Sequence, residues 1–157
     1  MALSRDRLYP ILSLIMGGFL ASGCLPGLLN NSLTQRDAAL TAAAKNYLRA
    51  MNRSQEAHYL THGSFAQTLD ELQLVISKEI DGYRLEIITV DDQKVVMTGQ
   101  AQAENLPHFG AAVFVDESAM ATRILCQSEG ASAAPPIPQL EGATPTCPSG
   151  SENLDAP

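Results

Sequence analysis

Residues 46–65 of the chain read NYLRAMNRSQEAHYLTHGSF and mark the end of a long helix. From Asn31 to Leu60 the composition is rich in alanine, and small or apolar residues recur at steps of three and four. These residues are Leu40, Ala43, Ala44, Tyr47, Ala50, Met51, Ser54 and Ala57. The spacing predicts an amphipathic helix of about 27 residues, capped by Ser32 or Thr34 and ended by Gly63. Because its apolar face is built mostly from small residues, a sheet is the expected partner.

The rest of the chain predicts strands and then a loop. Thr68 and Glu71 have the spacing of a capping box, which predicts one short turn through Leu72. The β-rich runs 83–90 and 94–101 predict an antiparallel hairpin, and 111–115 and 122–127 predict two further strands. From Ser128 onward, proline, alanine, serine and glycine dominate, which predicts a loop that cannot fold alone. The expected fold class is α+β, with one helix packed on a four-stranded antiparallel sheet.

Residues 50–65, AMNRSQEAHYLTHGSF, resemble the motif AMNRAQQAYYLENGSF of the type IV pilin-like G and H family, cyanobacterial relatives of pilins and pseudopilins. Segments 113–115, 124–128 and 146–150 resemble the last strands of that family and its disulfide-closed C-terminal loop. The resemblance covers residues 24–154 and implies a pilin-like fold with a long N-terminal helix. It also implies a structural or interaction role with other pilin-like or secretion-system subunits as partners.

The N-terminal leader departs from the pilin pattern. Pilins begin with a leader that ends in Gly, then Phe or Met, and a Glu at the fifth mature position. Counting back from Pro26, which resembles the proline of the family's helix, that Glu should fall near Tyr9, where no acid stands. Gly18 and Phe19 lie inside the apolar run, and Gly23 stands where the Glu would be needed. The loss of this Glu favours a peripheral role over that of a major filament subunit.

The first residues predict export. Arg5, Asp6 and Arg7 precede a stretch without charge at 8–35, the order found in export signals. Three alternatives stay open for this segment. Residues 20–24 fit a lipobox with Cys24 as the lipidated residue, an ordinary signal peptidase could release a product that begins at Cys24, or the segment could remain as a membrane anchor. The expected organisation is 1–23 as signal peptide or anchor, 24–127 as the pilin-like body and 128–157 as a Pro-rich C-terminal loop and tail.

Two cysteines of the body are predicted to form a disulfide. In an exported protein Cys126 and Cys147 should pair, and closing a loop of this size contributes about 3 kcal/mol in the chain-entropy model. A zinc site is not expected, because neither cysteine has a nearby histidine. His58 and His62 are four residues apart, but Tyr59 stands where the HExxH motif has its Glu. The sequence therefore assigns no metal ligand.

Charge and motifs predict a protein without catalytic chemistry. The formal net charge is −7, so the chain lacks the basic footprint of nucleic-acid binders. The acidic pairs at 70–71, 91–92 and 116–117 fit caps and turns, and no nucleophile elbow is present. No cofactor and no enzymatic activity are expected.

The sequence thus predicts a non-enzymatic, exported and membrane-anchored protein of the periplasm or cell surface. Its expected role is a minor or accessory component of a type IV pilus or a type II secretion-like system. The alternative is a membrane-anchored lipoprotein that uses a pilin-type headpiece as a binding module and does not polymerise. Cys24 separates the two, because a lipidated Cys24 removes the apolar segment before it and a filament core could not form.

Overall fold

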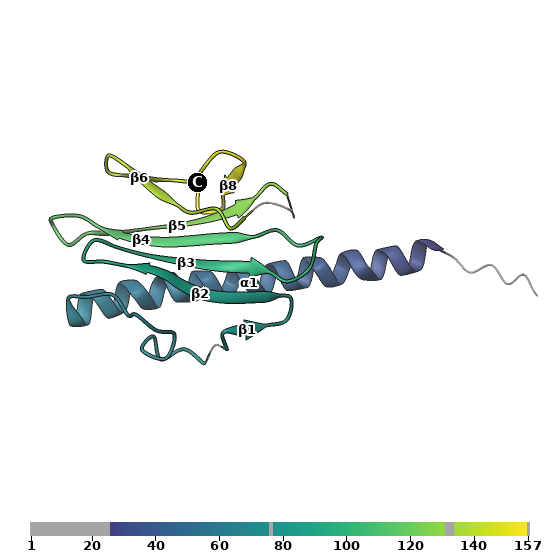
Figure 1. Cartoon of the computed structure of the whole chain (residues 1–157), viewed down its shortest axis with the longest axis horizontal. Helices are drawn as coiled ribbons and strands as arrows, with labels where there is room; N and C mark the ends of the chain where they lie inside the picture. Colours follow the sequence, from purple (N-terminus) through teal and green to yellow (C-terminus); the bar gives the residue numbers. More distant parts are fainter. Residues whose placement is uncertain (1–25, 76, 131–133, 157) are drawn as a thin grey trace, which may run out of the picture.

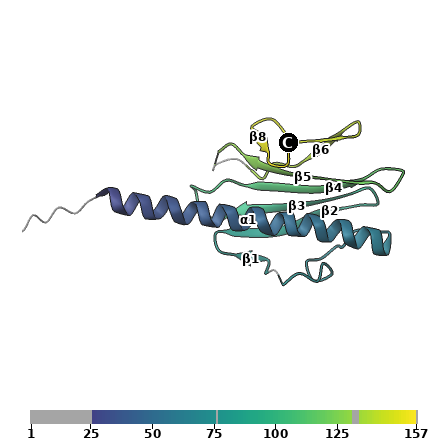
Figure 2. The same cartoon turned by 180° about the vertical axis from the view of Figure 1, so that it is seen from behind.

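The computed structural model describes residues 26–75, 77–130 and 134–156. One long helix lies across one face of an antiparallel sheet (Figures 1 and 2). The elements are α1 (Pro26–His62), β1 (Glu79–Ile80), β2 (Tyr83–Val90), β3 (Lys94–Ala101), β4 (Phe109–Val115), β5 (Ala121–Ser128), β6 (Gln139–Glu141), β7 (Thr144–Thr146) and β8 (Ser151–Asn153). The α+β class and the helix-on-sheet arrangement expected from the sequence are confirmed.

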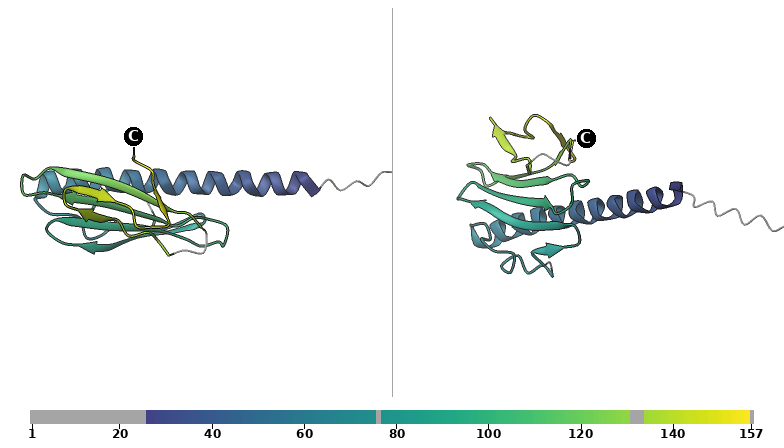
Figure 3. Two further views of the ribbon diagram at one scale, coloured as in Figure 1. Left: turned by 90° about the horizontal axis from the view of Figure 1, so that it is seen from above. Right: turned by 45° about the vertical axis from the view of Figure 1, so that its right-hand side comes forward.

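Helix α1 is longer than predicted, with 37 residues. It begins at Pro26, so Ser32 and Thr34 lie inside the helix and the prediction that either one caps it is wrong. A proline fits the first helical turn because its missing N–H would have no partner there. At the other end Gly63 adopts a φ of 72°, and its N–H donates to the carbonyl oxygen of Tyr59 at 2.8 Å, which confirms the predicted stop. The N-terminal turns of α1 extend past the sheet (Figure 3).

The buried face of α1 matches the predicted one in part. Ala44 and Met51 are buried as predicted, and Leu40 packs against the core. Leu48 is fully buried, whereas Tyr47, expected in the core, is 36% exposed. The buried residues that follow this face are Ala44, Leu48, Met51, Asn52 and Gln55. In an alanine-rich segment several ridges satisfy the three- and four-residue spacing, and packing selects the ridge that carries Leu48.

The main sheet has six strands in the order β1-β2-β3-β4-β5-β8, so the prediction of four strands is wrong. The four predicted strands are its centre, and the register of β2 on β3 shifts once, between Ile87 and Thr89. The additional strands are short edge strands of two and three residues, too short to show an alternating pattern in the sequence. The segment predicted as a loop supplies β8 and the separate β6–β7 hairpin.

Strand β4 is buried along its whole length because both faces of the sheet are covered. Phe109, Ala111 and Val113 belong to the core beneath α1. Ala112 and Phe114 belong to a second cluster with Val96, Ile124 and Cys126, against which Cys147 packs. The sheet therefore forms the middle layer between the helix and part of the C-terminal segment.

Candidate interaction site

The C-terminal segment is fastened to the sheet by a disulfide and by close backbone packing. Cys126 on β5 is bonded to Cys147, with 5.7 Å between their Cα atoms, so the predicted pairing is present. Pro136 crosses β4 so closely that a Cβ placed on Gly110 would lie 1.6 Å from the Pro136 carbonyl oxygen. Glycine is required at this crossing because any side chain would collide with the backbone.

The junction between α1 and β5 is held by polar contacts. The Asn52 amide group donates from Nδ2 to the carbonyl oxygen of Ile124 at 3.1 Å. Arg123 forms an ion pair with Glu56 at 3.1 Å across the same junction. These contacts hold the end of β5 that carries Arg123 against α1.

Arg49 joins the C-terminal tail to this junction. Its guanidinium donates to the carbonyl oxygen of Leu154 at 3.0 Å and pairs with Asp155 at 3.4 Å. The tail is thereby drawn toward α1 where β8 ends.

A groove with a volume of about 610 Å³ runs along the junction. Its lining residues are Arg49, Asn52, Arg53, Glu56, Ala121, Thr122, Arg123, Pro145 and Asp155. We call it the β5 groove.

The β5 groove, lined by three arginines and two carboxylates, has a net positive charge, whereas the chain as a whole is acidic. Helix α1 carries four basic and two acidic residues, a formal charge of +2, whereas residues 63–156 carry four basic and fourteen acidic residues, a formal charge of −10. Both carboxylates of the groove, on Glu56 and Asp155, are engaged by arginines. Arg53 is exposed and has no ion pair within the described part of the chain. The groove therefore presents one free guanidinium, which favours a negatively charged partner.

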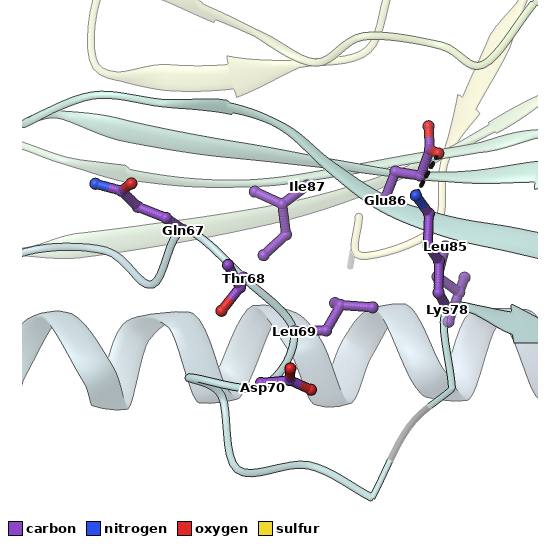
Figure 4. Close-up of a pocket in the computed structure, with 8 residues that line it drawn as sticks. All are labelled: Gln67, Thr68, Leu69, Asp70, Lys78, Leu85, Glu86 and Ile87. Atoms are coloured by element: carbon purple, nitrogen blue, oxygen red, sulfur yellow. Dashed lines mark ion pairs between the residues drawn. The ribbon is translucent and has the colours of Figure 1, made fainter.

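A second hollow, of about 460 Å³, lies between the loop after α1 and strand β2 (Figure 4). Lys78 points toward Glu86 there, and the two form an ion pair of 3.3 Å. The neighbouring turn follows the predicted capping pattern in part: Thr68 Oγ1 accepts from the N–H of Glu71 at 3.3 Å, and the Glu71 carboxylate accepts from the N–H of Gln67. No helix follows this turn, and its groups are occupied with local structure.

His58 and His62 stack on each other with 4.2 Å between ring centroids. His58 Nδ1 lies 2.8 Å from the carbonyl oxygen of Ser64, and His62 Nδ1 lies 3.1 Å from that of His58. A carbonyl can only accept, so each Nδ1 is the protonated nitrogen and helps to close the end of the helix. Within the described ranges, no group of three or more His, Cys, Asp or Glu side chains could hold a metal ion.

Three titrating groups outside the two hollows have shifted pKa values. The hydrogen bond to Glu79 raises the pKa of Arg84. Burial raises the pKa of the Tyr83 hydroxyl above 10.0, an effect that Thr41 opposes and Asp37 reinforces. Hydrogen bonds from Ser118 and from the backbone N–H of Met120 lower the pKa of Asp116. Asp116 organises the turn between β4 and β5, as the acidic pair at that position predicted.

The structure and the sequence differ on which residues form the candidate site. Cys24 lies outside the described residues, and in the part of the chain that the structure describes no helix is long and apolar enough to cross a membrane. The residues of the β5 groove were not predicted as a site. The sequence feature that could have pointed to the groove is the pair Arg49 and Arg53, four residues apart on α1. Such a pair is common on an exposed helix face and does not indicate a site.

Of the three comparisons with known proteins, one finds a match. The chain has no match among curated proteins and none among solved structures. The model of the family described as type IV pilin-like G and H matches residues 41–148, which is more than half of the 157 residues. The matched region runs from the buried half of α1 to the disulfide and its following proline. On this evidence the chain belongs to the type IV pilin-like G and H family.

Proposed function

We propose that the protein is a non-enzymatic minor or accessory component of a type IV pilus or a type II secretion-like system. The observation that carries the proposal is the division of α1 into two parts. Its C-terminal part is fixed on the sheet, and its N-terminal turns extend beyond it (Figure 1). Family membership supports a structural protein of the cell envelope whose partners are other pilin-like or secretion-system subunits.

The described contacts would let α1 and the sheet act as one body. Leu48 and Met51 are fully buried beneath the sheet. Asn52 bonds to β5, and Gln55 bonds to the loop after the helix. A force or a position imposed on the projecting turns would therefore be transmitted to the sheet, as a subunit of an assembly requires.

A second candidate is a lipoprotein that presents the same headpiece and does not polymerise. Its support is the place of Cys24, two residues before Pro26, where α1 begins. A lipid on Cys24 would hold the first helical turn at a membrane surface and leave no apolar segment for a filament core.

The mass and the N-terminus of the protein purified from its native membrane test both candidates. An N-terminus that retains residues 8–23 supports the pilus component. A diacylglyceryl group on an N-terminal Cys24 supports the lipoprotein and contradicts the pilus component.

The variant Cys24→Ala supplies the matched comparison. For the lipoprotein it should release the protein from the membrane fraction, whereas for an uncleaved anchor retention should be unchanged. Co-purification of pilin-like subunits with the wild-type protein would support the pilus component, and an isolated headpiece with no such partner would count against it.

A further inference from the structure

The β5 groove contains an open edge of the main sheet. Strand β8 pairs with β5 only at Cys126, Gln127 and Ser128. The remaining residues of β5, from Ala121 to Leu125, are not paired with a strand on this edge among the described residues. Strand β7 contacts β5 without pairing to it, and Leu154 bonds to Leu125. An unpaired edge offers main-chain N–H and C=O groups for a further strand.

The register shows which main-chain groups face outward. The N–H of Leu154 donates to the carbonyl oxygen of Leu125 at 2.9 Å, and the N–H of Glu129 donates to that of Gly150 at 3.0 Å. Main-chain polar groups of successive residues point to opposite sides of a strand, so those of Ala121 and Arg123 point the same way as those of Leu125. Both residues line the groove just beyond the end of β8.

The described part of the tail, up to residue 156, does not pair with this part of the edge. Arg49 holds the carbonyl oxygen of Leu154 and the carboxylate of Asp155, so the chain turns toward α1 after its last bond to β5. Pro145 of β7 also lines the groove, and it has no N–H that could donate to the open edge of β5.

A buried polar atom marks the same place independently. Asn52 is 2% exposed, and its Oδ1 has no hydrogen-bond partner among the described residues. Its Nδ2 donates to the carbonyl oxygen of Ile124, which leaves Oδ1 as a buried acceptor without a partner on a residue that lines the groove. A buried acceptor without a partner costs stability and is expected where a ligand supplies a donor.

From these observations we infer that the β5 groove binds a short extended segment of a partner protein that carries a carboxylate. The segment adds to the sheet beside Ala121 and Arg123, through main-chain hydrogen bonds. Its carboxylate pairs with Arg53, the free guanidinium of the groove, and one of its N–H groups is placed to satisfy Asn52. The inference rests on the proposed role as an interaction protein and names the surface that would serve it.

Peptide binding to the full-length chain in detergent micelles tests the inference. The probe is acetyl-Thr-Val-Glu-Val-Thr-amide, and its matched control has Gln in place of Glu. In ¹H–¹⁵N NMR spectra the Glu peptide should give saturable shifts confined to 49–56 and 121–125, with at least tenfold weaker binding of the Gln peptide. Shifts elsewhere, or none at millimolar peptide, would overturn the inference.

Two variants separate the charge from the backbone contribution. Arg53→Glu should weaken binding of the Glu peptide at least tenfold, whereas Arg36→Glu, the same charge change on α1 outside the groove, should leave it unchanged. Ala121→Pro removes an outward N–H at the first residue of β5, a position where a strand tolerates proline, and should also weaken binding. Undiminished binding by Ala121→Pro would contradict strand addition, and undiminished binding by Arg53→Glu would contradict the carboxylate pairing.

Sedimentation of the protein alone distinguishes the other possible occupant. Self-association that Arg53→Glu abolishes would mean that a second copy fills the groove, and the inference of a separate partner would then be wrong. Arg53→Glu should leave the N-terminus and membrane retention unchanged. Failure of this inference can therefore be told apart from failure of the proposed function.

Discussion

Gln55 and Ala66 are joined by two hydrogen bonds, although eleven residues separate them. The Ala66 N–H donates to Gln55 Oε1 at 2.9 Å, and Gln55 Nε2 donates to the Ala66 carbonyl oxygen at 3.0 Å. Both residues are fully buried. The side-chain amide thus makes the two hydrogen bonds that a neighbouring strand would otherwise make to Ala66. These bonds fix the loop after α1 against the helix.

Gln55→Ala should therefore lower the free energy of unfolding by about 2–4 kcal/mol, because it leaves the N–H and C=O of Ala66 buried without partners. Gln67→Ala, an exposed glutamine whose side chain makes no described hydrogen bond, is the control and should change stability by less than about 0.5 kcal/mol. Urea unfolding followed by circular dichroism measures both. Equal stability of the two variants would show that the paired bonds contribute nothing.

The observed face of α1 gives a second prediction. Leu48→Ala should cost about 2–5 kcal/mol, because Leu48 is fully buried and lies against Gly99. Tyr47→Ala should cost much less, since that ring is partly exposed. The same unfolding experiment decides. A larger loss for Tyr47→Ala would mean that the helix packs through the face predicted from the sequence.

The crossing of Pro136 over β4 gives a third prediction. Gly110→Ala places a methyl group where the Pro136 carbonyl oxygen lies, so the C-terminal segment must move away from the sheet at a cost of about 1–3 kcal/mol. Limited proteolysis should then cut at 134–146 faster than in the wild type. Gly130→Ala is the control, because a Cβ there meets nothing within 4 Å. Unchanged proteolysis of Gly110→Ala would contradict the close crossing.

Asp116 makes stability depend on pH at the acidic end. Its carboxylate accepts from the Ser118 hydroxyl at 2.6 Å and from the Met120 N–H at 2.9 Å, and these bonds lower its pKa from the ordinary 3.8. A group whose pKa is lower in the folded state stabilises the fold above its unfolded pKa, and this stabilisation is lost as pH falls through the folded value. Stability should therefore fall below pH 3.8.

Asp116→Asn removes this titration, and the difference in unfolding free energy between pH 5 and pH 2 should become smaller. Asp92→Asn is the control, because this exposed carboxylate makes no hydrogen bond or ion pair within the described residues, and it should leave the difference unchanged. Chemical denaturation at several pH values measures the effect, and NMR titration of the Asp116 carboxyl measures its pKa. A pKa at or above 3.8 would contradict the prediction.

Local features of the sequence predicted much of the fold. The apolar periodicity of 40–57 and Gly63 predicted a helix and its end, because helix spacing and a left-handed stop are local properties. The hairpin with its acidic connection at 91–93 and the strands around 116–119 were predicted for the same reason. The family and the Cys126–Cys147 disulfide could also be predicted, because the motif at 50–65 and the two cysteines of the body are visible in the sequence.

Only the tertiary structure decided which ridge of α1 is buried, because alanine-rich spacing fits Tyr47 and Leu48 equally well and the sheet selects one. The short strands β1 and β8 form only by pairing with β2 and β5, and they are too short to show an alternating pattern in the sequence. The β5 groove is the clearest case. Arg49 and Arg53 read as solvated helix residues, and they become a site only when Arg123 and Asp155, more than sixty positions away in the sequence, are packed beside them. The sequence determines elements through local geometry, whereas a site is made by non-local contacts that exist only once the core has formed.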